Sequence, residues 1–238
     1  MNVANISVAQ LALAFIPVAV VVFIMWRSNR GHGRALQAIA RMLLQLMLIG
    51  YVLVYIFQSE SSLVIVGILS VMLLAASWIA LNTVDLSRST LFPASLISVI
   101  LGGGSTLALI SQGVLRLDPW YQPSYIIPLA GMIFASSMTN ISLALERLCA
   151  ELANDASYQA ARDTAFRTSM IPVINSFLAV GLISLPGMMT GQILSGVSPL
   201  IAVRYQIMVM CMIFGAAGLS TLCFLKLIRG TDHFKAYR

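Results

Sequence analysis

Carboxamide side chains stand inside several long apolar stretches of this 238-residue chain, and they are its clearest candidates for binding a solute. Gln45, Asn140, Asn175, Gln192 and Gln206 each bring hydrogen-bond donors and an acceptor into a segment that is otherwise hydrocarbon. Hydrogen bonding between membrane helices is one explanation, worth about 0.6 kcal/mol per residue on average. Lining of a path for a solute is the other, and the sequence leaves both open.

A proline–glycine pair, Pro186-Gly187, interrupts one of these apolar stretches. It frees backbone carbonyl groups at membrane depth, where irregular backbone is tolerated only if protein or a water-filled cavity satisfies it. Met188, Met189 and Met132 offer thioethers, which bind soft metals but more often serve as flexible core packing. The segment predicts a cavity wall or a moving helix, with a packed kink as the alternative. The predicted path residues are Gln45, Met132, Asn140, Asn175, Pro186, Gly187, Met188, Met189 and Gln192.

The motifs of common hydrolases and nucleotide-binding enzymes are absent from the sequence. Gly102-Gly103-Gly104-Ser105-Thr106 is the nearest match to a phosphate-binding loop, but it lacks the lysine and lies in an apolar stretch. Close packing of helices through small residues explains it better. H-E-x-x-H and G-x-S-x-G are also missing, and the apolar stretches hold no cluster of Asp, Glu or His. We therefore predict that the protein is not an enzyme, with no cofactor and no metal site of its own.

The composition is that of an integral membrane protein. Only 9% of the residues are charged, against about 25% in an ordinary globular domain, and the mean hydropathy is +0.93. The net charge of +6 suits the positive-inside rule better than nucleic-acid binding. Cys149, Cys211 and Cys223 lack metal-ligand spacing and are expected to be free thiols. We interpret residues 1–238 as a single membrane domain.

Seven stretches are long enough to cross a bilayer, which takes about 20 mostly apolar residues. They lie at 7–26, 38–57, 63–81, 91–111, 125–145, 172–194 and 206–227. With the N-terminus outside, every lysine and arginine except Arg116 and Arg204 falls on the inner side. The sequence thus predicts an all-α polytopic membrane protein of about seven helices, with an external N-terminus and a cytoplasmic C-terminus.

The inner loop at 146–170 is rich in both charge and alanine, and it predicts a cytoplasmic helix. Asn154 or Asp155 is expected to cap this helix, because a short polar side chain can accept hydrogen bonds from the first-turn N–H groups. Asp163 and Arg167 stand four residues apart and are expected to pair.

Several sequence blocks resemble the FetB-type ABC permease family, over roughly residues 38–220. The most specific are Leu185-Pro186-Gly187-Met188-Met189-Thr190-Gly191 and the later Tyr205-Gln206-Ile207-Met208-Val209. Blocks starting at Arg41, at Pro128 and at Ile171 follow the family's order as well. Bacterial members resemble the membrane half of an ATP-driven iron exporter, and plant relatives act in aluminium tolerance and are linked to nucleotide-sugar export.

The resemblance implies that a cytoplasmic coupling helix at 150–167 inserts into a separate ATPase subunit. The coupling residues so implied are Glu151, Asp155, Ala156, Tyr158, Gln159, Arg162 and Asp163. Relatives carry a Gly-Ala-Thr/Ser turn before this helix, and alignment backwards from Arg162 places Ala150-Glu151-Leu152 there.

The resemblance also implies a homodimer in the cell inner membrane, bound to two ATPase copies that hold ATP and Mg²⁺. Iron or another metal is the cargo it suggests first, and an organic solute such as a nucleotide sugar is the alternative. The span count alone also permits a seven-span receptor or scaffold without transport.

Overall fold

The computed structural model describes residues 7–28, 32–57, 61–84 and 86–230. Nearly all of these residues are helical, and the described part holds no strand beyond one isolated bridge between Val180 and Ser184. The chain divides into two compact units, Met1–Ser59 and Glu60–Arg238, which are described separately. The expectation of an all-α protein is confirmed.

The first unit contains α1 (Val8–Leu13), α2 (Phe15–Arg27) and α3 (His32–Phe57). Ser7 and Gln10 form a reciprocal capping box at the start of α1, which satisfies two otherwise unpaired N–H groups. Aromatic and aliphatic side chains of α2 and α3 line a groove of about 450 Å³. Gln45 lies on α3 with its side chain exposed.

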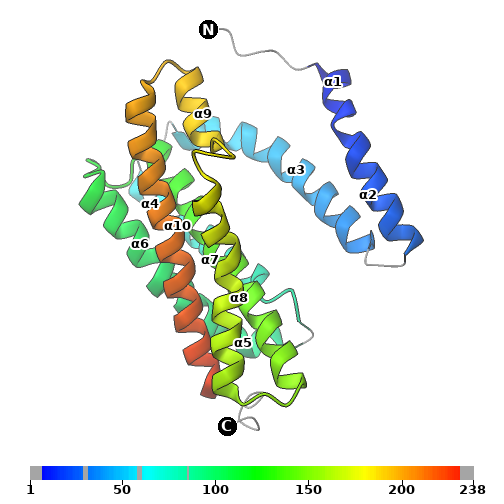
Figure 1. Ribbon diagram of the computed structural model, residues 1–238. Coiled ribbons are helices and arrows are strands. Elements are labelled where there is room, and N and C mark those ends of the chain that lie inside the picture. The colour runs from blue at the N-terminus through cyan, green and yellow to red at the C-terminus, as the bar shows by residue number, and fades with distance from the viewer. Residues whose placement is uncertain (1–6, 29–31, 58–60, 85, 231–238) are drawn as a thin grey trace. The chain divides into compact units, whose positions relative to one another are not determined.

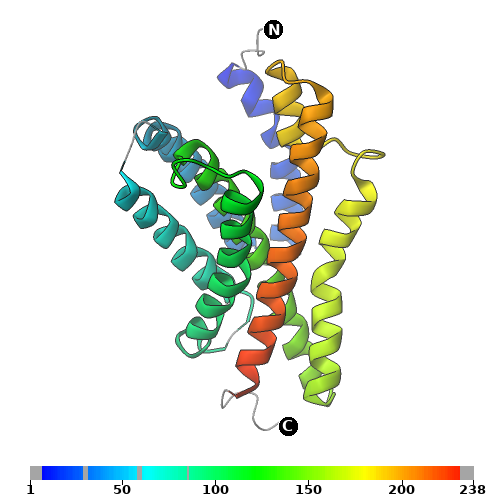
Figure 2. The ribbon, with the colours of Figure 1, turned by 90° about the vertical axis from the view of Figure 1, so that its left-hand side faces the viewer.

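The second unit is a helical bundle in which α7, α8 and α10 run lengthwise beside one another (Figure 1). The turn between α7 and α8 and the C-terminal end of α10 lie at one end of the bundle, and α9 lies at the other (Figures 1 and 2). Its elements are α4 (Ser62–Ile79), α5 (Arg88–Ser98), the π-helix η1 (Val99–Gly104), α6 (Ser105–Ala108), the π-helix η2 (Leu109–Val114), α7 (Pro123–Ala153), α8 (Tyr158–Ala179), α9 (Gly187–Leu194), α10 (Pro199–Leu227) and the short 3₁₀-helix η3 (Ile228–Gly230).

Small residues allow the close approach of η1, α7 and α10. A side-chain carbon at Gly102 would lie 2.7 Å from the Cα of Ser220 and closer still to its amide nitrogen, so only glycine fits there. At Gly103 it would meet Ile133 at 3.2 Å. Ser220 donates a 3.0 Å hydrogen bond to Ser137, which ties α10 to α7 where the backbones are close. The predicted packing role of this glycine run is confirmed for Gly102 and Gly103.

The described residues contain six helices, counting continuous helical stretches, that are long and apolar enough to cross a membrane. They are Val8–Arg27, His32–Phe57, Ser62–Ile79, Arg88–Val114, Pro123–Ala153 and Pro199–Leu227. The expected span at 172–194 is wrong as a single helix, because α8 ends at Ala179 and α9 starts only at Gly187. The last span starts at Pro199 rather than at 206, so the connection after Ser195 is short.

The count of seven crossings and the orientation of the termini stay predictions. Three of the cations on which the orientation depends, Arg30, Lys235 and Arg238, lie outside the described residues. The described ends of α7, α8 and α10 that carry Arg147, Arg162 and Lys226 do gather at one end of the bundle, as the positive-inside rule requires.

Candidate functional site

The turn between α7 and α8 is closed by a Schellman motif. The amide of Ala156 donates to the carbonyl of Glu151 at 3.2 Å, and that of Asp155 donates to Leu152, also at 3.2 Å. Asp155 has a φ of 59°, the left-handed conformation that favours glycine. These bonds satisfy the last carbonyl groups of α7 and reverse the chain within four residues. We call residues 151–163, which surround this turn, the hairpin tip.

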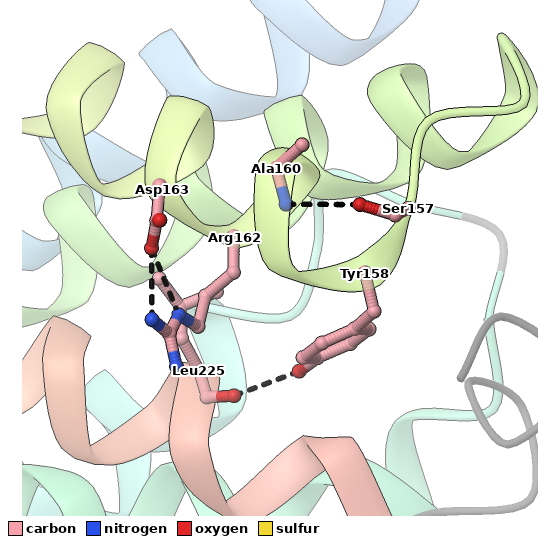
Figure 3. A network of polar contacts seen from close by, with 6 residues as sticks. All are labelled: Ser157, Tyr158, Ala160, Arg162, Asp163 and Leu225. Atoms are coloured by element: carbon pink, nitrogen blue, oxygen red, sulfur yellow. Dashed lines mark hydrogen bonds and ion pairs between the residues drawn. The ribbon is translucent and has the colours of Figure 1, made fainter.

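A capping serine and a buried tyrosine fix the start of α8 (Figure 3). The Ser157 hydroxyl accepts a hydrogen bond from the Ala160 amide at 3.4 Å. Tyr158 is only 4% exposed, and its hydroxyl donates to the Leu225 carbonyl of α10 at 2.7 Å. Burial raises the pKa of Tyr158 to about 12, although nearby Arg162 and Arg229 act in the opposite direction. The phenol therefore stays protonated and keeps donating at physiological pH.

The structure corrects three expectations about this segment. The single coupling helix at 150–167 is wrong, because those residues are the end of α7, a turn and the start of α8. Ser157 is the cap rather than Asn154 or Asp155, because Asp155 takes the left-handed position at the end of the preceding helix. Asp163 pairs with its neighbour Arg162 at 2.8 Å, and not with Arg167.

The turn before the helix also lies at another place than the resemblance implied. Residues 154–157 form the turn before α8, whereas Ala150-Glu151-Leu152 belongs to α7. The left-handed φ of Asp155 explains why glycine suits this position.

The hairpin tip contains all seven predicted coupling residues, which are distributed over the end of α7, the turn and the start of α8 instead of one helix. Asp155, Gln159 and Asp163 are exposed, whereas Ala156 is half-buried and Tyr158 is buried. Glu151 and Arg162 are half-buried, and each forms an ion pair, with Arg147 and Asp163 respectively. The tip thus presents polar side chains on a backbone that is held against α10.

At the opposite end of α8 the chain leaves the helix at Val180. The Ala179 carbonyl accepts from three successive amides, those of Leu182, Ile183 and Ser184, at 3.3, 2.8 and 3.2 Å. Leu182 is 90% exposed and Ile183 is 84% exposed, so this connection makes little tertiary contact. Pro186 then precedes the first turn of α9. The interruption predicted at Pro186-Gly187 is therefore present, and it begins at Val180.

Two cavities flank α9. The first, which we call the α7–α9 cavity, has a volume of about 440 Å³ and lies among α7, α9 and the start of α10. It brings together three of the predicted path residues, Met132, Met188 and Gln192. The second, the α8–α10 cavity, has a volume of about 380 Å³ and contains Met189 and Gln206 among mostly apolar neighbours.

The remaining predicted path residues lie elsewhere. Asn140 is 3% exposed on α7 and donates to the Ser136 carbonyl of its own helix at 3.0 Å. Asn175 is exposed on α8, and Gln45 belongs to the first unit. Pro186 and Gly187 shape the start of α9 but do not line either cavity.

Sequence reasoning missed the aromatic and hydroxyl groups of the α7–α9 cavity, namely Ser124, Tyr125 and Tyr205. Tyr205 stands next to Gln206 within a recognised motif, which was a usable signal. Ser124 and Tyr125 read as ordinary residues at the start of a span, so nothing in the sequence marked them. Within the described residues, no group of three His, Cys, Asp or Glu side chains is arranged to hold a metal ion.

Comparison with known proteins agrees with this architecture. The model of the Uncharacterised protein family (UPF0014) matches residues 8–231. The chain is 35% identical to a UPF0014 membrane protein of Synechocystis sp., over 86% of this chain and 85% of that protein. It is 34% identical to the "Probable iron export permease protein FetB" of Escherichia coli, over 94% and 92% of the two chains.

A plant protein matches over a similar length. The chain is 33% identical to "Protein ALUMINUM SENSITIVE 3" of Arabidopsis thaliana, over 95% of this chain and 88% of that protein. No solved structure matches. The extent of these matches, together with the apolar spanning helices, shows that the chain is a multi-pass membrane protein and belongs to the UPF0014 family.

Proposed function

We propose that this protein is the membrane permease of an ATP-driven exporter, and that a separate ATPase subunit binds the hairpin tip. The observation that carries the proposal is the construction of the tip. Exposed Asp155, Gln159 and Asp163 stand on a backbone fixed by the Schellman motif, the Ser157 cap and the bond from Tyr158 to α10. Such a tip can receive a force without deforming.

The path of α8 supports transmission of that force. This helix is continuous for 22 residues, about 33 Å at 1.5 Å per residue. It runs from the tip to the irregular connection at 180–186, next to the α8–α10 cavity. Displacement of the tip would therefore move the C-terminal end of α8, where the packing is weakest. If the ATPase binds one position of the tip more tightly than another, its binding would shift the population of the permease toward the first.

The cargo and the assembly are further parts of the proposal. The name of the Escherichia coli relative specifies iron export, which supports iron or another metal as the cargo. Two copies of this chain would pair with two ATPase subunits, and ATP and Mg²⁺ would bind to those subunits. The inner membrane is the location that fits a bacterial permease of this kind.

Charge reversal at the tip tests the ATPase contact. Full-length protein carrying Asp163→Arg would be co-expressed with a stand-alone ABC ATPase from the same genome, and recovery of the complex would be measured by co-purification. We expect recovery to fall about tenfold, equivalent to about 1.4 kcal/mol. The control, Asp118→Arg, makes the same two-unit charge reversal at an exposed site in the loop between η2 and α7, and it should leave recovery unchanged. Equal recovery of the two variants would refute docking at the tip.

A further inference from the structure

The α7–α9 cavity has the size of a small-molecule site. Its volume of about 440 Å³ falls within the roughly 300–1,000 Å³ typical of pockets for small organic ligands. The coordination shell of a single metal ion is much smaller, because its ligands stand only about 2.0–2.6 Å from the metal. The volume therefore suits an organic molecule rather than a bare ion.

The lining carries no side chain that is charged at neutral pH. Ser124, Tyr125, Gln192 and Tyr205 supply its polar groups, and Met132 and Met188 supply thioethers. Hard cations such as Mg²⁺ require oxygen ligands, mostly carboxylates, and a net charge left in an uncharged cavity loses its hydration without compensation. These residues disfavour both a bare hard cation and a strongly anionic solute.

Gln192, which lines this cavity, has one side-chain atom that lacks a hydrogen-bond partner. The Oε1 atom of Gln192 is buried and accepts no hydrogen bond within the described residues. A buried, unsatisfied acceptor costs about 1–3 kcal/mol, so rotation of the Gln192 amide to accept a hydrogen bond from a ligand in the cavity would recover that cost. The amide stands beside aromatic and thioether surfaces that suit an apolar body.

We infer that the α7–α9 cavity binds an uncharged organic molecule that has an apolar body and an O–H or N–H donor directed at Gln192. This inference rests on the proposed function, because it takes the bound molecule to be the cargo of the exporter. A metal cargo would then enter as a neutral complex of such a molecule, held by the organic part.

Binding of 2,3-dihydroxynaphthalene to the full-length protein in nanodiscs, without any ATPase, tests this inference. This probe has an apolar aromatic body and two O–H donors. We expect saturable binding by calorimetry, and affinity about tenfold lower for 2,3-dimethoxynaphthalene, which keeps the body and loses the donors. Gln192→Met should weaken the dihydroxy probe about tenfold and leave the dimethoxy probe unchanged.

Two further variants keep the result interpretable. Gln206→Met is the matched control, because Gln206 has the same kind of unpartnered buried Oε1 but lines the α8–α10 cavity, and its change should not affect binding. Met132→Trp fills the α7–α9 cavity and should abolish binding of both probes. Each variant is compared only after its thermal unfolding midpoint matches that of the wild type.

Several results would overturn the inference: no saturable binding of the dihydroxy probe, equal binding by Gln192→Met, or saturable binding of Fe²⁺ alone that is lost in Met132→Trp. Because this assay omits the ATPase, its outcome is independent of the co-purification experiment. Failure of tip docking with retained probe binding would contradict the proposed function alone, and the reverse result would contradict the inference alone.

Discussion

The two ends of α8 are built in opposite ways, although one uninterrupted helix joins them. At the hairpin tip, Tyr158 is buried and bonded to α10, and Ala161 and Ala165 are fully buried behind it. At the other end, Leu182 and Ile183 extend away from the bundle, and two cavities flank the next helix. The packed end resists deformation, whereas the open end has room to move.

Local stability in a protein follows burial and tertiary contact, and elements that move come from its weakly packed parts. The contrast agrees with the proposed function, in which the hairpin tip binds the ATPase and the segment at 180–194 changes shape. Between them, a small cluster of Met170, Val173 and Ala217, with Phe166 and Ile213 against it, keeps α8 in register with α10.

The largest effect is expected where the packed region has no spare volume. Gly102→Ala would place a carbon against the backbone of Ser220, which cannot rotate away, and we expect a loss of about 3 kcal/mol of stability. A carbon added at Gly104, in the same π-helix, or at Gly191, in α9, would have no neighbour within 4 Å. Alanine at either position should therefore be neutral or slightly stabilising. Thermal unfolding of the purified variants measures the difference. Similar unfolding midpoints for all three variants would contradict the difference in packing between the two regions.

A second pair of substitutions compares the turns at the two ends of α8. Gly181 has a φ of 83°, so Gly181→Ala should cost about 1–2 kcal/mol. Asp155 has a φ of 59°, and Asp155→Gly should gain up to about 1 kcal/mol because glycine adopts this conformation without strain. Equilibrium unfolding in detergent checks both signs. A destabilising Asp155→Gly would show that the aspartate side chain has a role at the tip beyond its backbone conformation.

The smallest effect concerns the bond between Tyr158 and Leu225. Tyr158→Phe removes one hydrogen bond and should cost about 1 kcal/mol at neutral pH. The pKa of Tyr158 is raised to about 12 from an ordinary value of about 10, so its contribution is complete below pH 10 and is lost as pH rises through 12. The wild type should therefore lose more stability than Tyr158→Phe between pH 9 and pH 11.5. Parallel pH profiles would indicate that the phenol titrates normally.

Much of the fold followed from the sequence because membrane spans are marked by composition over many residues. The spans at Val8–Arg27, His32–Phe57 and Ser62–Ile79 end within two residues of the predicted ones, since the apolar run ends where the helix ends, although the second starts six residues earlier than predicted. The span at 172–194 was predicted as one helix because the hydropathy averaged over a segment does not detect a turn within it. The turn that starts at Val180 is set by backbone hydrogen bonding to Ala179, which no average of side-chain polarity reports.

The candidate sites followed from the sequence only in part. The family blocks and the charge-rich loop located the hairpin tip, but the division into two helices depended on the left-handed Asp155. Met132, Met188 and Gln192 were chosen by residue type, and so were Asn140 and Asn175, which lie outside both cavities. Which of them share a cavity depends on how far apart α7, α9 and α10 stand.

The sequence by itself determined that this is a helical membrane protein, that a charge-rich loop joins two of its long segments, and that an interruption stands near Pro186-Gly187. These properties are local or compositional, so one chain read in order is enough to give them. The tertiary structure alone decided that Tyr158 bonds to Leu225, that Gly102 lies against Ser220, and that Gln192 faces a cavity with Met132. Each joins residues about 60 or more positions apart, and such contacts are fixed by the packing of whole helices rather than by the neighbours of either residue.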